Sequence, residues 1–272
     1  MTVQVSGEDV AQLFGSAGKA QGKLQRWKSR PGCEYVADEV LAHVSSAIFD
    51  IEPEAIQQLE TEHPLGVLRE EFDSTVRLIR DWRPDFAFAH LFHFCLEDLG
   101  RIYSWQEFRD DWCKVPSRRP WLWNPARDIQ HQAANYLVHR KGLAEDRALV
   151  VAHDALQWRI GAFYYSFLRE VYALSWLRRQ SLPALSHPLA DALFRADIWC
   201  GNSVVGIYIE NPHYRSGPQG RKHPAQYYLE DQRRFSFVDL RMAKPGEFGT
   251  VALPTDDEMQ ICADTLRAQL RT

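Results

Sequence analysis

Residues 144–180 constrain the fold of this chain more than any other segment. They are apolar and aromatic on several faces of a helix, and they read as one continuous helix. At a rise of ~1.5 Å per residue such a helix spans about 55 Å. We therefore expect a central helix around which the other helices pack, with Gly161 as its weakest point.

Helical periodicity extends over residues 34–190. Apolar residues recur there at steps of about four, so each segment has one apolar stripe. Ser104 and Glu107 have capping-box spacing before one helix, and Asn124–Pro125 opens another. Gly142 is placed to end that second helix.

The pattern changes after Pro183. A hairpin is predicted at residues 195–211 and a helix at residues 225–235. Two more strands are predicted at residues 236–242 and 249–254, and a last helix from Thr255 onward. The predicted fold class is α+β and predominantly α-helical, with an N-terminal multi-helix body and a C-terminal ββαββα unit. Its predicted parts are a flexible basic segment (1–33), the helical body (34–190) and the α+β unit (191–272).

Composition narrows the class of protein. The formal net charge of -4 argues against coating of nucleic acid by the whole surface, but it permits a local basic patch. The N-terminal residues lack the features of a signal peptide, and no apolar run reaches the length of a membrane span. We expect a cytoplasmic protein that does not enter a membrane. The five cysteines form no C-x-x-C pair, and no cofactor is predicted.

Basic residues are concentrated in two places. Residues 10–33 contain no acid and five cations, which are Lys19, Lys23, Arg26, Lys28 and Arg30. Residues 213–244 contain seven cations against three acids, with tyrosines interleaved. Charge and stacking together make this second region the candidate contact for phosphate or nucleic acid, and a solvated loop is the alternative. The candidate residues are Arg215, Arg221, Lys222, Arg233 and Arg234.

The hairpin in residues 195–211 carries two carboxylates. A two-residue turn at Gly201–Asn202 predicts that Ile198 pairs with Val205 and Cys200 with Ser203. Asp197 then lies opposite Gly206, and Glu210 lies about 13 Å further along at ~3.4 Å per residue. Carboxylates so far apart cannot share one cation, whose oxygen ligands lie at ~2.0–2.6 Å. Because Arg195 is near both acids on the same face, we expect a surface charge ladder.

The same two acids resemble the general plan of the PD-(D/E)xK nucleases over about fifteen residues. That resemblance implies a metal-dependent nuclease or other phosphodiesterase that uses Asp197, Glu210 and Lys222. The sequence departs from the family pattern, because Asn211 and Pro212 follow Glu210 and no acidic-x-Lys occurs in the chain. This function is therefore the alternative.

Two other clusters are candidate sites. Residues 105–125 contain four tryptophans between two helices, and an exposed Trp121 and Trp123 with Arg118 and Arg119 would form an anchor for a partner. If the tryptophans are buried, they attach the loop to the body instead. The group His90, His93 and Glu97 has the spacing of one helix face and is the alternative metal site, with buried histidines as the competing interpretation.

The function predicted from these features is that of a non-catalytic binding or adaptor protein. It would engage nucleic acid or a protein partner, within a larger complex, through the basic loop and the Trp-rich loop. No single motif in the sequence assigns the chain to an enzyme class.

Overall fold

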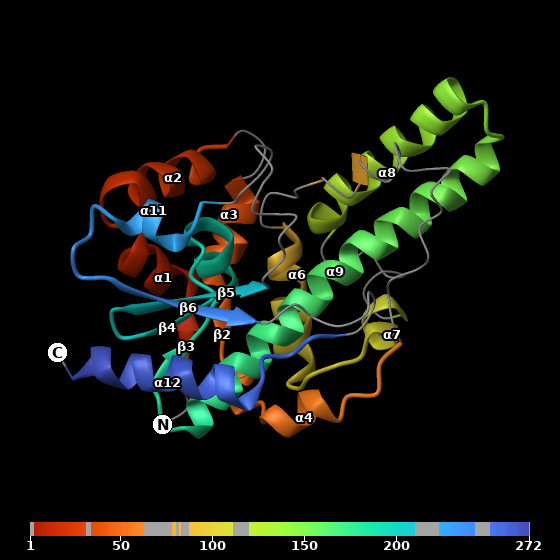
Figure 1. Ribbon diagram of the computed structural model, residues 1–272. Coiled ribbons are helices and arrows are strands. Elements are labelled where there is room, and N and C mark those ends of the chain that lie inside the picture. The colour runs from red at the N-terminus through yellow and green to blue at the C-terminus, as the bar shows by residue number, and fades with distance from the viewer. Residues whose placement is uncertain are drawn as a thin grey trace.

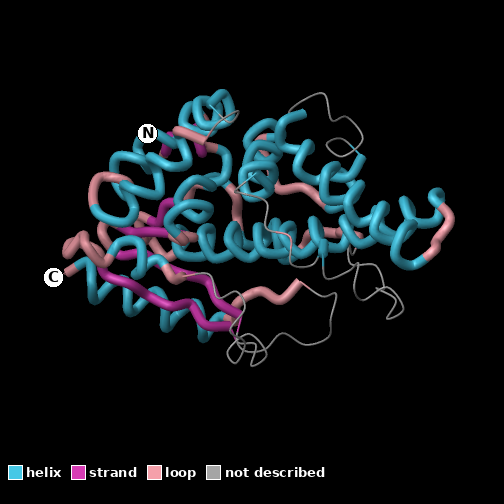
Figure 2. Tube along the Cα trace, turned by 90° about the horizontal axis from the view of Figure 1, so that it is seen from above, coloured by secondary structure: helices cyan, strands magenta, loops and turns pink. Residues whose placement is uncertain are grey.

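The computed structural model describes residues 3–30, 34–62, 78–79, 82, 87–110, 120–209, 223–242 and 251–271. These parts are mostly helical, and a four-stranded sheet lies among helices from both ends of the chain (Figure 1, Figure 2). The predicted fold class, α+β and predominantly α-helical, is confirmed. None of the described helices combines the length and the hydrophobicity of a membrane span.

Helix α9 (Glu145–Arg179) confirms the predicted central helix. Its C-terminal half is largely buried and packs against α6 (Ala87–Leu99), α4 (Pro53–Gln57) and η1 (Ala47–Asp50). Its N-terminal half pairs with α8 (Pro120–Lys141), and the two helices extend as an arm away from the sheet (Figure 1).

Helix α8 ends where predicted but begins earlier. Gly142 has a φ of 68° and its N–H donates to the carbonyl oxygen of Val138 at 3.1 Å, as at a glycine that ends a helix. The predicted start at Asn124–Pro125 is corrected, because the helix begins at Pro120 and continues through Pro125. Pro125 is the sixth residue of the helix and removes one backbone donor there, and α8 is packed along α9.

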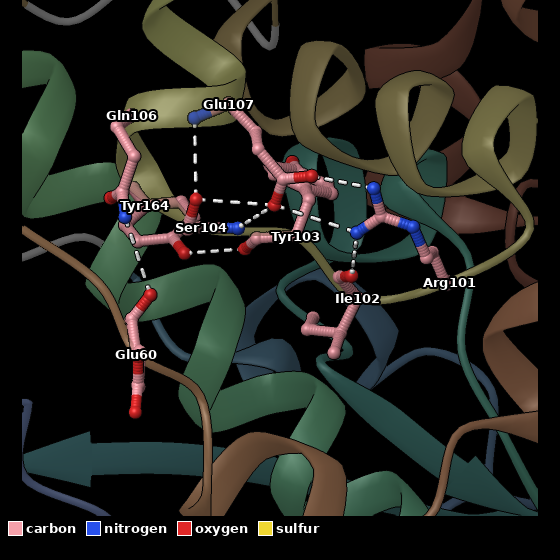
Figure 3. Close-up of polar contacts among 8 residues, drawn as sticks. All are labelled: Glu60, Arg101, Ile102, Tyr103, Ser104, Gln106, Glu107 and Tyr164. Carbon is pink, nitrogen blue, oxygen red and sulfur yellow. Dashed lines mark hydrogen bonds and ion pairs between the residues drawn. The ribbon is translucent and has the colours of Figure 1, made fainter.

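Helix α7 (Trp105–Phe108) is held to the body by a polar network (Figure 3). Glu107 N donates to Ser104 Oγ at 3.2 Å and Ser104 N donates to Glu107 Oε2 at 2.9 Å, which confirms the predicted capping box. The guanidinium of Arg101 donates to the Glu107 carboxylate at 2.5 Å. Two more hydrogen bonds attach this segment to other parts of the chain. Tyr164 Oη of α9 donates to Tyr103 O at 2.6 Å, and Gln106 Nε2 donates to Glu60 O at 3.4 Å.

Replacement of Glu107 by glutamine is expected to lower the free energy of unfolding at pH 7 by about 1 kcal/mol. The Arg101 guanidinium and the Ser104 hydrogen bonds lower the pKa of Glu107 to about 2. A lowered pKa means that this stabilisation is present above pH 4.5 and is lost as the pH falls toward 2. Urea denaturation at pH 7 measures the change.

The matched control is Glu145→Gln, which removes an exposed carboxylate from the first turn of α9. It is expected to change the urea midpoint only slightly. Equal shifts for the two variants would show that the contacts in Figure 3 add nothing to helix capping.

The sheet has the strand order β3-β4-β5-β6. Its strands are β3 (Ala184–Leu185), β4 (Ile198–Cys200), β5 (Ser203–Ile209) and β6 (Ser236–Met242). Ile198 lies opposite Val205 and Cys200 opposite Ser203, so the predicted hairpin register is confirmed. The strands β5 and β6 run parallel, whereas the other pairs are antiparallel.

The helices of the C-terminal unit follow the predicted order. Helix α11 (Ala225–Leu229) lies between β5 and β6 in the sequence, and α12 (Asp256–Leu270) begins at the predicted capping box of Thr255 and Glu258. Residues 251–254 are described without a strand, and the short β3 pairs with the other side of the hairpin instead. The unit is therefore close to the predicted ββαββα arrangement.

The N-terminal residues form helices where the sequence predicted a flexible segment. Helices α1 (Gly7–Phe14) and α2 (Gly18–Lys28) pack against the C-terminal unit (Figure 1). The Phe14 ring is buried and contacts three rings at centroid distances of 5.3 to 5.7 Å, those of Phe194, Trp199 and Phe235. Burial of one such ring contributes ~1.5–3 kcal/mol, which favours the ordered arrangement. The chain continues through α3 (Glu34–Ala42) and β2 (Val44–Ser45), which pairs with β1 (Val5–Ser6).

Candidate functional site

Helix α2 carries a basic stripe, defined here as Lys19, Lys23, Arg26 and Arg30. Their spacing of four, three and four residues places them on one side of a helix. Arg30 stands just past the helix end, at the position of the next turn. Arg26 and Arg30 are exposed, and the apolar side of α2 is buried through Ala20, Leu24 and Trp27. Burial of that apolar side leaves Arg26 and Arg30 exposed, whereas Lys23 is half-buried.

Two lysines of the basic stripe lie over the tyrosine rings of α11. Lys19 Nζ is 4.1 Å from the centroid of the Tyr227 ring, and Lys23 Nζ is 4.0 Å from that of Tyr228. Cation–π contacts of this length are worth ~0.5–1 kcal/mol at exposed sites. They align α11 with α2, although about 200 residues separate the two helices in the sequence.

Acidic residues neutralise one end of the stripe. The ammonium group of Lys19 forms an ion pair with Glu230, and Asp231 Oδ2 accepts a hydrogen bond from Lys19 N at 3.2 Å. Asp231 thereby places a negative charge at the N-terminus of α2, where the N-cap residue makes no side-chain bond. Gly18 permits this contact, because it has a φ of 60° and an added Cβ would lie 2.3 Å from Asp231 Oδ2. The basic stripe is therefore neutralised at Lys19, whereas Arg26 is exposed and forms no ion pair with a described carboxylate.

The predicted phosphate-binding residues have different outcomes. Arg215, Arg221 and Lys222 lie outside the described residues. Arg233 is exposed and pairs with no carboxylate in the described part of the chain. Arg234 donates to the carbonyl oxygen of Leu13 and lies 4.8 Å from the centroid of the Phe235 ring, so it attaches α1 to β6.

Asp197 does not lie in the predicted charge ladder. Its Oδ2 accepts a hydrogen bond from Ile207 N at 2.6 Å, and Asp191 and Glu170 are its charged neighbours. Burial and these two negative charges raise the pKa of Asp197 well above its usual value. Arg195 has a left-handed φ of 62° and pairs with Asp191 at 3.8 Å. The prediction assumed an extended strand through Arg195, and the left-handed backbone of Arg195 interrupts it.

The nuclease alternative is not supported by the described residues. Glu210 and Lys222 lie outside them. Glu170 accepts a hydrogen bond from Ser186 and lies 3.6 Å from His93 Nε2, so the acids around Asp197 already have other neighbours. Over the ranges that the structure describes, no three His, Cys, Asp or Glu side chains converge as metal ligands.

The alternative metal site at His90, His93 and Glu97 is corrected. Both imidazoles are buried, which is the competing interpretation from the sequence. The Glu97 carboxylate accepts hydrogen bonds from the N–H groups at the start of η1, those of Ser46, Ala47 and Ile48, at 2.8 to 3.2 Å. Its oxygens are therefore directed to the backbone, away from a shared ligand with the histidines.

The Trp-rich loop is attached to the body in its described part. Trp123 is 7% exposed, so its indole is not available to a partner, and this corrects its expected role as an exposed anchor. Trp105 is 1% exposed and packs on Phe108. The side chain of Trp121 and residues Arg118 and Arg119 lie outside the described part of the chain.

Sequence reasoning missed the basic stripe as part of this site. The five cations between residues 10 and 33 were noted, but the segment was expected to be flexible. The spacing of Lys19, Lys23, Arg26 and Arg30 is a helical pattern that could have revealed their common side. No pattern in the sequence could have shown that they lie beside α11.

Comparisons with known proteins give no family or function for this chain. No protein-family model, no curated protein and no solved structure matches the chain.

Proposed function

We propose that this protein is a non-catalytic binding protein that engages nucleic acid through the basic stripe of α2. The observation that carries the proposal is the alignment of Lys19, Lys23 and Arg26 on one side of α2, with Arg30 just past the end of the helix. The stripe is ~16 Å long at ~1.5 Å per residue, which corresponds to roughly five nucleotides at ~3.4 Å each along one strand.

The charge distribution supports this proposal. The chain as a whole has a formal net charge of -4, so the attraction to phosphates must come from a local surface. Arg26, Lys28 and Arg233 are exposed and have no carboxylate partner among the described residues. Cations of this kind release counterions from nucleic acid when they neutralise phosphates.

The predicted phosphate-binding loop would extend the same surface. Arg221 and Lys222 immediately precede His223 in the sequence, and His223 packs on Tyr227 of α11. The described end of that loop is therefore beside the stripe. We place this binding in the cytoplasm and within a larger complex, as the sequence predicted.

Fluorescence anisotropy with labelled 20-nucleotide single strands and duplexes, at ~50 to ~200 mM salt, tests the proposal. Because Lys19 is paired with Glu230, three phosphate contacts are expected, which give a slope of log K against log salt of about -2 for single strands and about -3 for duplexes. Absence of binding at 50 mM salt, or binding that salt does not weaken, would contradict it. Binding by a protein partner in place of nucleic acid is then the next function to examine.

A further inference from the structure

The aromatic rings beside the basic stripe form a stack. The rings of His223 and Tyr227 are nearly parallel, with centroids 3.8 Å apart and an interplanar angle of 14°. Lys19 Nζ lies 4.1 Å from the centroid of the same Tyr227 ring. Two groups this close to the ring centre cannot share one face without overlapping each other, so they occupy opposite faces of Tyr227. The order of the stack is Lys19, Tyr227, His223.

The stack is held by contacts on its side. Tyr228 stands at 86° to Tyr227 and 84° to His223, and Lys23 lies over the Tyr228 ring. The two lysines are one helical turn apart on α2, and each covers one of two consecutive tyrosines on α11. Because both helices contribute, the position of the rings is set by the packing of α2 on α11.

The face of His223 that points away from Tyr227 is the candidate surface for a ligand. His223 is exposed, and within the described part of the chain no ring or cation is stacked on the side that faces away from Tyr227. Proteins bind unpaired bases by stacking them on an exposed aromatic ring, while cations along the same site contact the backbone of the strand. Here Tyr227 lies between the His223 ring and Lys19. Bases in a duplex are stacked on one another and do not offer a free face.

We propose that the partner is a single-stranded nucleic acid, one base of which stacks on His223 while the basic stripe contacts its phosphates. This inference rests on the proposed function and specifies its ligand. Base–aromatic stacking tolerates any base, so the site is expected to favour single strands without a strong sequence preference.

The test compares affinities for a 20-nucleotide single strand, the duplex of the same sequence, and an abasic strand of equal length. The wild-type protein is expected to bind the single strand about tenfold more tightly than the other two. His223→Ala is expected to lower the ratio of single-strand to duplex affinity about tenfold, with little change in the salt slope. His223→Phe is expected to restore the ratio, because phenylalanine keeps the ring.

The outcomes separate the two proposals. Equal affinity for the single strand and the duplex, or an unchanged ratio in His223→Ala, overturns the single-strand inference and leaves the basic stripe as a nucleic-acid site. Absence of binding to all three ligands overturns both. If His223→Phe lowers the ratio of single-strand to duplex affinity as much as His223→Ala does, the stack only supports α11. This result would also overturn the inference.

Discussion

Acidification from pH 7 to pH 4 is expected to lower the free energy of unfolding by several kcal/mol, because the fold buries two histidines, His90 and His187, whose pKa values burial lowers. His43, His90, His93 and His187 are each at most 8% exposed. Burial lowers the pKa of His90 well below its usual value and that of His187 to about 3. In the unfolded chain the imidazoles of His90 and His187 bind protons below pH 6.5, whereas in the fold they do so only at far lower pH.

The contacts of His187 explain why the fold favours its neutral form. Its Nδ1 accepts a hydrogen bond from Leu189 N at 3.1 Å, and its Nε2 lies 3.2 Å from the carbonyl oxygen of His43. A neutral imidazole with hydrogen on Nε2 satisfies both neighbours, whereas protonation of Nδ1 would place two donors against each other.

The sign and the size of the effect follow from linkage. A histidine pKa that is lowered in the fold contributes stability above pH 6.5, and this stability is lost as the pH falls toward 3. At ~1.36 kcal/mol per pH unit, His187 alone would remove about 3 kcal/mol by pH 4. Most domains have only ~5–15 kcal/mol of stability, so a loss of this order is a large fraction.

Circular dichroism and tryptophan fluorescence between pH 3 and pH 8, with urea titrations at each pH, measure this loss. His187→Gln is expected to be less stable than wild type at pH 7 and to lose less stability between pH 6.5 and pH 4. The control His139→Gln replaces an exposed imidazole on α8 and is expected to follow the wild-type curve. A wild-type protein equally stable at pH 4 and pH 7 would show that these histidines titrate normally.

Reversal of charge on the basic stripe is expected to abolish most binding to nucleic acid. The double variant Lys23→Glu, Arg26→Glu removes two phosphate contacts and adds two repulsive charges. We expect a loss of affinity on the order of 100-fold at ~50 mM salt. The salt slope for single strands is expected to fall by about 1.4, which is ~0.7 for each lost contact.

The controls separate binding from folding. Arg140→Glu with Arg147→Glu makes the same change in net charge on exposed residues of the α8–α9 arm, far from α2 (Figure 1). It is expected to keep the affinity within about threefold of wild type. The single variant Arg26→Glu avoids the contact of Lys23 with Tyr228 and is expected to lose about tenfold without a change in melting temperature. Equal losses in both double variants would indicate an effect of net charge alone.

Local chemistry made several features predictable from the sequence. The span of α9, the capping boxes before α7 and α12, the end of α8 at Gly142 and the Gly201–Asn202 hairpin were all read correctly. Each depends on residues a few positions apart, whose spacing and backbone preferences are visible in the sequence itself.

Asp197 shows where such reasoning fails. Alternation along a strand predicted an exposed acid beside Arg195, but β4 begins only at Ile198 and Arg195 has a left-handed backbone. The side chain of Asp197 is instead near Asp191 and Glu170, the second of which comes from α9. A strand pattern carries no information about a helix that covers the strand.

The sequence by itself determined the central helix, the capping boxes before α7 and α12, the end of α8 and the pairing of the hairpin, but it did not reveal the helices α1 and α2. Only the tertiary structure placed α2 beside α11, gathered four histidines in the interior and buried Trp123. The physical reason is distance along the chain. Capping, turns and periodicity act between near neighbours, whereas the basic stripe meets the tyrosines through packing of segments about 200 residues apart.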